Sequence, residues 1–408
     1  MEKILRAAVE RGASDLHVKT GDVFRARVDG RLVPLTKQAL TAEQTRAIAL
    51  SLIPVEADRA RVDELTDYDC SYALPGLGRF RVNIMRQRGA FAVVMRLIPT
   101  DVPTIGQLRL PGVVARIAEA ERGMVLVTGV TGSGKSSTMA AMVRHINERQ
   151  EKHVVTLENP IEYLHADIRS SVTQREIGSD TESFRSGLRA VLRQDPDVIL
   201  IGEMRDRETV DTAMKAAETG HLLVSTLHTP DAQSTILRAM AMFPPEEQLV
   251  VRMRLAEALQ AVVSQRLLPR ASGKGRVVAA EVMVVTPAIR DLIAEGRISE
   301  IRDFIAEGRT QYGMQTFDQH LTDLVRAGEV TYEAALTAAT RPADFALQFK
   351  MLHSAGPSAP SAPVPRPVAA PAQPIQPPAP QPAGAAAAAG AGDMTGFQGP
   401  GEFDFLTG

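Results

Sequence analysis

Apolar residues along the chain fall into two patterns, short uninterrupted runs and longer stretches with helical spacing. The uninterrupted runs cover residues 125–128, 154–157, 198–201, 222–226 and 277–285. Runs of this length predict buried strands, and their alternation with helical patterns predicts a parallel sheet. Beyond the fourth run the spacing is mainly helical and predicts helices over residues 246–265, 287–295, 298–308, 316–327 and 332–339. The middle of the chain, residues 112–350, is therefore expected to form an α/β domain with a helical C-terminal part.

The first 100 residues show a different pattern. A helical stretch over residues 2–11 precedes segments of alternating apolar and polar residues, of which 24–28 and 79–85 are the clearest. Alternation with period two predicts half-buried strands, so residues 1–100 are expected to form a small α+β domain. Three prolines punctuate the connection to the next domain, and residues 101–111 are interpreted as a linker.

The C-terminal segment, residues 351–408, differs in composition from the rest of the chain. Residues 355–408 hold 12 of the chain's 26 prolines and an alanine run at 385–389. Such a composition cannot bury a core, so the segment is expected to be a disordered tail, partly in polyproline II conformation. Its acidic and aromatic tip, residues 402–406, is open to two interpretations, a docking motif for an unknown partner or an end without function.

Composition and charge limit the classes of function. The 408 residues carry a formal net charge of −2 and are 44% hydrophobic, which is typical of a globular protein and does not suggest a nucleic-acid partner. The single cysteine, Cys70, excludes an intramolecular disulfide framework and a multi-cysteine zinc site, and it fits a reducing cytoplasm. The N-terminus lacks an apolar signal core, and no apolar run approaches the roughly 20 residues of a membrane span. Any action at a membrane is therefore expected to depend on docking.

Residues 129–136 read Gly-Val-Thr-Gly-Ser-Gly-Lys-Ser and match the phosphate-binding loop G-x-x-x-x-G-K-[ST]. The loop lies between a predicted strand and a predicted helix, so its N–H groups and the helix N-terminus can converge on phosphate oxygens. Lys135 is expected to reach the β- and γ-phosphates of a nucleoside triphosphate, and the Ser136 hydroxyl is expected to bind Mg²⁺. The predicted nucleotide-binding residues of this loop are Gly129, Thr131, Gly132, Ser133, Gly134, Lys135, Ser136 and Ser137.

Two acidic segments provide candidates for metal binding and catalysis. The apolar run at 198–201 is followed by Glu203, and a carboxylate at the carboxyl end of a strand beside the phosphate loop can meet Mg²⁺ or the attacking water. Glu203 is therefore the candidate for polarising that water. Glu158 and Glu162 follow the strand predicted at 154–157 and are candidates for the same region, although a surface turn explains this spacing equally well.

Histidines and arginines are further candidates. His221 and His228 bracket the strand predicted at 222–226, and a histidine beside a γ-phosphate can bond to it and report its hydrolysis. Ordinary structural histidines are the alternative. Arginines alternate along the predicted strands of the first domain, where they either bind phosphate, as arginine fingers from a neighbouring subunit, or form a solvated face. These arginines are Arg79, Arg81, Arg86, Arg88 and Arg96.

Four segments of the chain stand in an order that is typical of one superfamily. They resemble the four boxes of the secretion-superfamily ATPases. These are the Walker A motif at residues 129–136, the Asp box at 156–163, the Walker B motif at 195–206 and the His box at 219–229. The start of that family's PAS-like N-terminal domain is similar to residues 12–17 and 27–30.

Within this superfamily, the chain most resembles the type IV pilus retraction ATPases, the PilT/PilU group. Residues 287–295 and 313–316 are similar to segments of that group. One cysteine cannot build the four-cysteine insertion of the extension and type II secretion ATPases. Asn159, Asp291 and Ala294 depart from the residues that are usual in the group.

The resemblance implies a homohexameric ring of PAS-like and RecA-like domains, with ATP and Mg²⁺ bound between the two domains. Glu203 is implied as the catalytic glutamate, with Glu158, Glu162 and His228 in support. Ser136 and Glu158 are the implied metal ligands. Further nucleotide contacts are predicted for Arg81, Arg96, Arg238 and His221. The implied partner is an inner-membrane pilus platform protein, with a paralogous pilus ATPase as a further candidate, which places the ring at the cytoplasmic face of the membrane.

The leading hypothesis is an ATP-driven motor for pilus retraction and twitching motility. An accessory retraction ATPase that depends on another motor is the first alternative. A RecA-like nucleic-acid translocase is the second, and the near-neutral charge, the 4% aromatic content and the lack of tryptophan argue against it. A regulatory protein that binds nucleotide without turnover is the third, and the presence of both Lys135 and Glu203 argues against it.

Overall fold

The structure of the chain is a computed structural model, which describes residues 1–99 and 101–354. The segment predicted as a tail, 351–408, lies outside the described residues except for its first four, which belong to helix α15 (Pro342–Ser354). The helical part therefore extends past the boundary predicted at residue 350. In the ranges that the structure describes, no helix is long and apolar enough to cross a membrane.

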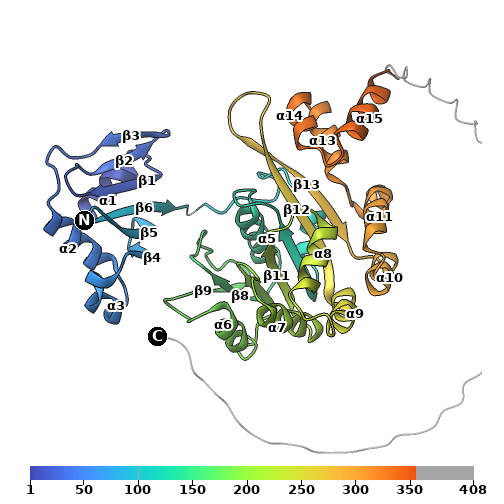
Figure 1. Cartoon of the computed structure of the whole chain (residues 1–408), viewed down its shortest axis with the longest axis horizontal. Coiled ribbons are helices and arrows are strands. Elements are labelled where there is room, and N and C mark those ends of the chain that lie inside the picture. The colour runs from blue at the N-terminus through green and yellow to red at the C-terminus, as the bar shows by residue number, and fades with distance from the viewer. Residues whose placement is uncertain (100, 355–408) are drawn as a thin grey trace, which may run out of the picture. The chain divides into compact units, whose positions relative to one another are not determined.

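The N-terminal domain contains a six-stranded antiparallel sheet with the strand order β3–β2–β1–β6–β5–β4 (Figure 1). Its strands are β1 (Asp15–Lys19), β2 (Arg25–Val28), β3 (Arg31–Pro34), β4 (Asp67–Leu74), β5 (Gly78–Gln87) and β6 (Ala90–Ile98). Its helices are α1 (Glu2–Glu10), α2 (Ala42–Leu52) and α3 (Glu56–Ala60).

One face of this sheet forms a core with the helices. In β5, Phe80, Val82 and Ile84 are buried at every second position, and they share a hydrophobic cluster with Leu5 of α1 and Leu52 of α2. The intervening positions of the strand point to the other face, because successive side chains in a strand alternate in direction. The α+β prediction for this part of the chain is confirmed.

The second domain contains a seven-stranded sheet with the order β13–β12–β7–β11–β10–β8–β9. Its strands are β7 (Gly123–Thr128), β8 (His153–Glu158), β9 (Ser171–Glu176), β10 (Val198–Ile201), β11 (Leu222–Leu227), β12 (Leu259–Pro269) and β13 (Arg276–Val284). All neighbouring pairs are parallel except β12 with β13, which form an antiparallel hairpin at one edge. The predicted α/β sheet is therefore confirmed.

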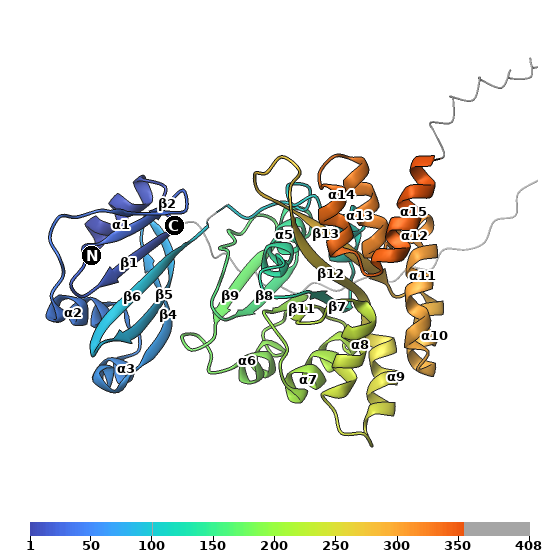
Figure 2. The same ribbon diagram turned by 45° about the horizontal axis from the view of Figure 1, so that its top comes forward.

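Helices pack on both faces of this sheet, as Figures 1 and 2 show, and two large hydrophobic clusters fill the layers between. The helices that precede β12 and β13 in the chain are α4 (Val113–Ala118), α5 (Lys135–Arg149), α6 (Phe184–Val191), α7 (Arg207–Glu218), α8 (Ala232–Ala241) and α9 (Gln248–Ala258). Those that follow are α10 (Pro287–Glu295), α11 (Ile301–Glu307), α12 (Arg309–Tyr312), α13 (Phe317–Arg326), α14 (Tyr332–Ala338) and α15. Both views show α13, α14 and α15 beside the β12–β13 hairpin.

One predicted helix of the second domain is wrong in part, and two of its strands, β9 and β12, are missing from the prediction. The helix predicted over 246–265 ends at Ala258, and β12 begins at the next residue. Strand pairing with β7 and β13 overrides the helical spacing there, and Val262 and Val263 favour a strand because they are β-branched. Strand β9 has no apolar run because it is a mostly polar edge strand, so periodicity does not reveal it.

The predicted linker belongs to the packing of the second domain. Ile105 and Leu110 are buried in one cluster with α4, α5 and the sheet, and the carbonyl of Val102 accepts a hydrogen bond from Arg144 of α5. Residues 102–110 are therefore held by the second domain, and they are not a free connection.

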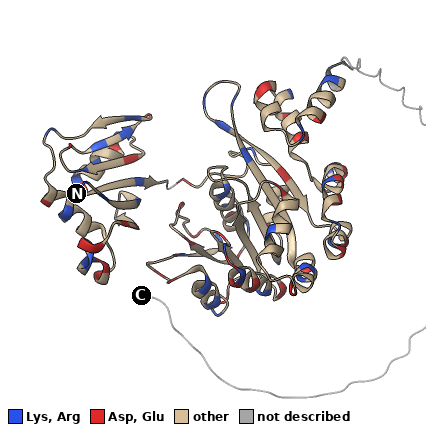
Figure 3. Ribbon diagram, in the orientation of Figure 1, with Lys and Arg blue, Asp and Glu red and all other residues tan. Residues whose placement is uncertain are grey.

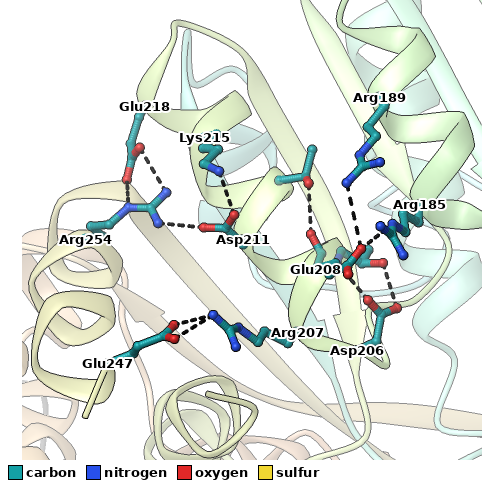
Figure 4. A network of polar contacts seen from close by, with 12 residues as sticks. Arg185, Arg189, Asp206, Arg207, Glu208, Asp211, Lys215, Glu218, Glu247 and Arg254 are labelled. Atoms are coloured by element: carbon teal, nitrogen blue, oxygen red, sulfur yellow. Dashed lines mark hydrogen bonds and ion pairs between the residues drawn. The ribbon is translucent and has the colours of Figure 1, made fainter. Parts of the chain in front are cut away.

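Ion pairs tie helix α7 to its two neighbours (Figure 4). Arg254 of α9 lies 2.7 Å from Asp211 and 2.7 Å from Glu218, both on α7. Arg207 at the start of α7 pairs with Glu247, the residue before α9, at 2.6 Å. Across the helix, α7 also pairs with Arg185 and Arg189 of α6 through Glu208. A helix that follows β10 directly is thus fixed on both sides.

We expect Phe317 to anchor the C-terminal helices. Its fully buried ring packs with Leu268, Leu321 and Phe345, and the guanidinium group of Arg266 lies 3.8 Å from its centroid. Phe317→Ala should lower the free energy of unfolding by about 3–5 kcal/mol, because it leaves a cavity and removes the cation–π contact. Urea unfolding measures this change.

The matched control for this variant is Leu347→Ala on α15, where the side chain is 56% exposed. It should change the free energy of unfolding by no more than about 0.5 kcal/mol. Equal effects of the two substitutions would contradict the anchoring role of Phe317.

Candidate nucleotide-binding site

The phosphate-binding loop lies between β7 and α5, as predicted from the sequence. Gly129, Gly132 and Gly134 all have positive φ angles, of 141°, 78° and 95°. A Cβ atom on Gly129 would lie 2.5 Å from the carbonyl oxygen of Gln265 and 2.5 Å from the Ser133 hydroxyl oxygen. Glycine is therefore required at position 129 both by backbone conformation and by the close approach of β12.

Lys135 begins α5 and is buried, with 8% of its surface exposed. Its Nζ donates hydrogen bonds to the carbonyl oxygens of Gly129 and Val130, at 2.9 and 3.0 Å. Burial lowers the pKa of this ammonium group, and the charges of Glu162 and Glu203 oppose that shift. Two carboxylates thus face the lysine that the motif assigns to phosphate binding.

A cavity of about 540 Å³ opens beside this loop. It is lined by four kinds of residue: loop residues, acids that follow strands, cations, and a few apolar side chains. From the predicted site it includes Thr131, Gly132, Gly134, Lys135, Ser136, Ser137, Glu158, Glu162, Glu203, His228 and Arg81. The fold therefore brings most of the predicted site into one cavity.

Glu203 and His228 follow the neighbouring parallel strands β10 and β11. Their side chains lie close together, with 3.8 Å between His228 Nε2 and Glu203 Oε2. Arg205 forms an ion pair with the same carboxylate, with its Nε at 2.7 Å. Desolvation lowers the pKa of His228, Lys135 and Arg205 lower it further, and Glu203 acts in the opposite direction. A neutral imidazole is thus favoured beside the carboxylate.

Glu158 ends β8 and is held by three hydrogen bonds. Its Oε1 accepts from the Thr156 hydroxyl at 2.7 Å and from Gln174 Nε2 at 3.0 Å, and its Oε2 accepts the N–H of Glu162 at 3.4 Å. Burial raises the pKa of this carboxyl group in spite of the three donors. Glu158 is therefore an acid fixed by its hydrogen bonds, whereas Glu162 and Glu203 are the acids whose charges act on the lysine of the phosphate loop.

The oxygen donors of the cavity fit Mg²⁺ bound together with a nucleotide. The Ser136 hydroxyl and the carboxylates of Glu158 and Glu203 line the same space, and such hard oxygen ligands suit this ion. Among the residues that the structure describes, no three His, Cys, Asp or Glu side chains are grouped to hold a metal by themselves. Phosphate and water oxygens would complete the coordination, as is usual for Mg²⁺.

Several predicted residues lie elsewhere. His221 precedes β11, at the opposite end of the strand from His228, so about 20 Å of strand separates it from the cavity edge. Its Nδ1 bonds to the Ala216 carbonyl at 2.9 Å. Within one subunit, His221 does not line the cavity, and its predicted contact with nucleotide stays a prediction. Arg96 pairs with Asp15 at 2.8 Å, and Arg238 lies in the last turn of α8, so neither lines the cavity.

The two remaining predicted residues shape the loop. Gly129 supplies a carbonyl to Lys135, and the Ser133 hydroxyl is fully buried under the loop.

The cavity also contains residues that were absent from the predicted site, among them Arg205, Tyr163 and Arg276. Arg205 stands two residues after Glu203, and Tyr163, whose hydroxyl bonds to the Ser137 hydroxyl at 2.8 Å, closes the second acidic segment. Both stand in segments that the sequence singles out. Arg276 is different, because only the fold of the β12–β13 hairpin brings it to the loop.

Comparison with known proteins places these features in a family. The family model described as "Type II/IV secretion system protein" matches residues 1–343. The type IV pilus ATPase PilU of Pseudomonas aeruginosa is 42% identical over 352 residues, covering 86% of this chain and 91% of PilU. The type IV pilus retraction ATPase PilT of the same organism is 42% identical over 343 residues, covering 84% and 99%. The crystal structure of the pilus retraction motor PilT with bound ADP matches with a TM-score of 0.77 and 41% identity, covering 84% of this chain and 97% of that one.

Gly129→Ala should disrupt the phosphate loop. The added Cβ would meet the Gln265 carbonyl and the Ser133 side chain at 2.5 Å, and a positive φ disfavours alanine. We expect the affinity for ADP, measured by isothermal titration calorimetry, to fall roughly tenfold or more.

Gly112→Ala is the control for this substitution. Gly112 has a φ of −59°, and a Cβ added there would meet no atom within 4 Å, so ADP affinity should stay within about twofold. An unchanged affinity in Gly129→Ala would contradict the assignment of the loop.

Proposed function

Because this chain belongs to the type II/IV secretion system protein family, we propose that it is a hexameric ATPase motor that hydrolyses ATP to power type IV pilus retraction and twitching motility. The observation that carries this proposal is the meeting of Lys135, Glu203 and His228 in one cavity beside the phosphate loop. The similarity to PilT and PilU supports it over most of the chain.

Each group in the cavity has a role that its position supports. The loop N–H groups and Lys135 bind the β- and γ-phosphates of ATP, and Ser136 with Glu158 would hold Mg²⁺, which would neutralise phosphate charge. Glu203 orients and polarises the attacking water, with Glu162 nearby in the same cavity. His228 bonds to the γ-phosphate and responds to its loss.

The arginines divide into two groups. Arg81 lines the cavity with the phosphate loop and is proposed to bind phosphate directly. Arg96 and Arg238 lie outside the cavity, so they would act on a nucleotide only from a neighbouring subunit of the ring, as arginine fingers do. Such a role requires the proposed homohexamer, in which ATP lies between a PAS-like N-terminal domain and a RecA-like domain.

The proposed partner is an inner-membrane pilus platform protein, reached by docking from the cytoplasmic side. A paralogous pilus ATPase is a second proposed partner. The relatives PilT and PilU match this chain at equal identity, 42%, so the accessory role remains the alternative to the main motor. Positively and negatively charged residues are interspersed along the helices of the second domain (Figure 3), which favours a protein partner over nucleic acid.

Glu203→Gln should separate binding from hydrolysis. The amide cannot polarise water, so kcat should fall roughly a hundredfold or more, while the Kd for ATP stays within about threefold. A coupled phosphate-release assay and a titration with fluorescent ATP measure the two quantities.

Glu246→Gln, at an exposed position, is the control and should hydrolyse ATP at the wild-type rate.

In cells that lack the wild-type gene, the wild-type chain should restore pilus retraction, and neither Glu203→Gln nor Lys135→Ala should restore it. Normal retraction in cells without the gene would disprove the main-motor function and leave the accessory role.

Arg81→Ala should raise the KM for ATP roughly tenfold, because one charge-assisted contact to phosphate is lost. Arg31→Ala, an exposed arginine on β3 of the same sheet, is its control and should leave KM unchanged. Steady-state kinetics over a range of ATP concentrations measures both. Equal KM values for the two variants would remove Arg81 from the proposed site.

A further inference from the structure

Glu281 is a buried acid that the proposed catalytic mechanism does not use. It lies on β13 opposite Ser264 of β12, and only 5% of its surface is exposed. Ala279 and Met283, two positions away on the same strand face, belong to hydrophobic clusters. A carboxyl group in such surroundings costs free energy unless its contacts compensate, so its contacts indicate what it does.

The main contact of Glu281 is with the start of helix α8. Its Oε1 accepts the backbone N–H of Ala232, the first residue of α8, at 3.0 Å. A carboxylate is favourable at this position because the N-terminus of a helix carries partial positive charge. The acid therefore fixes the first turn of α8 to the β12–β13 hairpin.

That turn is connected to the catalytic cavity by a short loop. His228 lies 3.8 Å from Glu203, and α8 begins at Ala232. Between them, the Thr229 hydroxyl bonds to the Thr235 hydroxyl of α8 at 2.6 Å. The loop 228–232 is thus held at one end by the site and at the other by Glu281.

The same turn also contacts the C-terminal helices. Gln233 Nε2 donates to the carbonyl oxygens of Ile298 and Ser299 at 2.7 and 2.9 Å, directly before α11. The positive charge of Arg302 on α11 acts on Glu281, and Arg302 is itself paired with Asp318 of α13 at 2.7 Å. The charge of Arg266 on β12 acts on Glu281 in the same way.

We propose that Glu281 is a positioning residue that couples the loop 228–232 to the C-terminal helices. It holds the first turn of α8 and, through that turn, holds His228 at Glu203. A displacement of α11 or α13 reaches His228 along this path, and the loss of a γ-phosphate at His228 reaches the C-terminal helices along the same path. This coupling rests on the proposed ATPase function, whereas the contact itself does not.

Hydrogen exchange of the full chain tests the contact independently of catalysis. Glu281→Ala removes the acceptor, and peptides from residues 229–241 and 298–307 should then exchange roughly fivefold faster or more. Glu281→Gln keeps an acceptor oxygen and should exchange like the wild type, as should the control Glu257→Ala, whose side chain is 70% exposed. Wild-type exchange of 229–241 in Glu281→Ala would overturn the proposal, even in a chain without ATPase activity.

Glu281→Leu, which fills the apolar surroundings and lacks an acceptor, serves if Glu281→Ala fails to fold. The same increase in exchange at 229–241 is expected for it, and an unchanged rate would overturn the proposal in the same way.

A double-mutant cycle tests the path through His228. Glu281→Ala and His228→Ala should each lower kcat roughly tenfold at saturating ATP, and the double variant should be within about twofold of His228→Ala. The Kd for ADP should stay within about twofold in Glu281→Ala, because the phosphate loop is untouched. Additive losses, about a hundredfold in the double variant, would show that Glu281 does not act through His228. A wild-type chain that does not hydrolyse ATP would instead refute the proposed function.

The protonation of Glu281 gives a further readout. Burial, with a smaller contribution from the charge of Asp231, raises the pKa of this carboxyl group to about 7, against the opposing effects of the Ala232 N–H, Arg302 and Arg266. Asp318 and His320 of α13 are the other titratable groups near this region, the latter accepting the N–H of Ala280. Glu281 thus binds its proton more tightly in the folded chain than in the unfolded chain, where the pKa of its carboxyl group is near 4.5.

Protonation of Glu281 stabilises the folded chain. This stabilisation is fully present below a pH of about 4.5 and is lost as the pH rises through about 7. Glu281→Gln has no such loss. The Tm of this variant minus the Tm of the wild type should therefore be a few degrees larger at about pH 8 than at about pH 5. Scanning calorimetry measures both chains at the two pH values. A constant Tm difference would mean that the carboxyl group is not held in these surroundings.

Discussion

Parallel hydrogen-bonded pairing of four strands is the constraint on which the rest of the structure depends. Val198 of β10 pairs with Val154 of β8 and Leu222 of β11, and Leu222 pairs with Gly123 of β7. Strands in this register end at the same edge of the sheet. The phosphate loop, His228, Glu203 and Glu158 each follow or end one of these strands, so one ladder of backbone bonds brings these proposed site residues together.

Buried polar contacts then hold this edge in one arrangement. The Thr128 hydroxyl bonds to the Ser264 hydroxyl at 2.8 Å, Gln265 Nε2 donates to the Thr138 hydroxyl at 2.7 Å, and the Thr226 hydroxyl donates to the Gly202 carbonyl at 2.7 Å. An unpaired group in this region would cost free energy, so each contact favours a single geometry. Catalysis benefits because charged groups that are already placed need no reorganisation during the reaction.

The helices that leave this edge are fixed by charge as well as by packing. Helix α7, which follows β10, is tied to α6 and α9 by ion pairs (Figure 4), and α8, which follows β11, is held at its first turn by Glu281. Rigid helices that begin at a catalytic strand can transmit a small displacement over the length of a domain. The two helices that follow β10 and β11 are therefore both held in place at the edge of the sheet where the cavity lies.

The sequence predicted the elements whose residues interact with near neighbours. The apolar runs at 125–128, 154–157, 198–201 and 222–226 all became buried strands, and the phosphate loop formed between β7 and α5. The prediction was wrong at β12. The apolar stretch there fits a helix or a strand, and only its pairing with β7 and β13 makes it a strand.

The chemistry divides in the same way. The sequence by itself determined the phosphate loop and the acids beside it, because a strand end and the residue after it are adjacent in the chain. Only the tertiary structure decided that Arg276 joins the cavity, that His221 lies at the far end of its strand from the cavity, and that Glu281 meets Ala232. These contacts depend on strand order and helix packing between segments far apart in the chain, and such long-range choices leave no local pattern in the sequence.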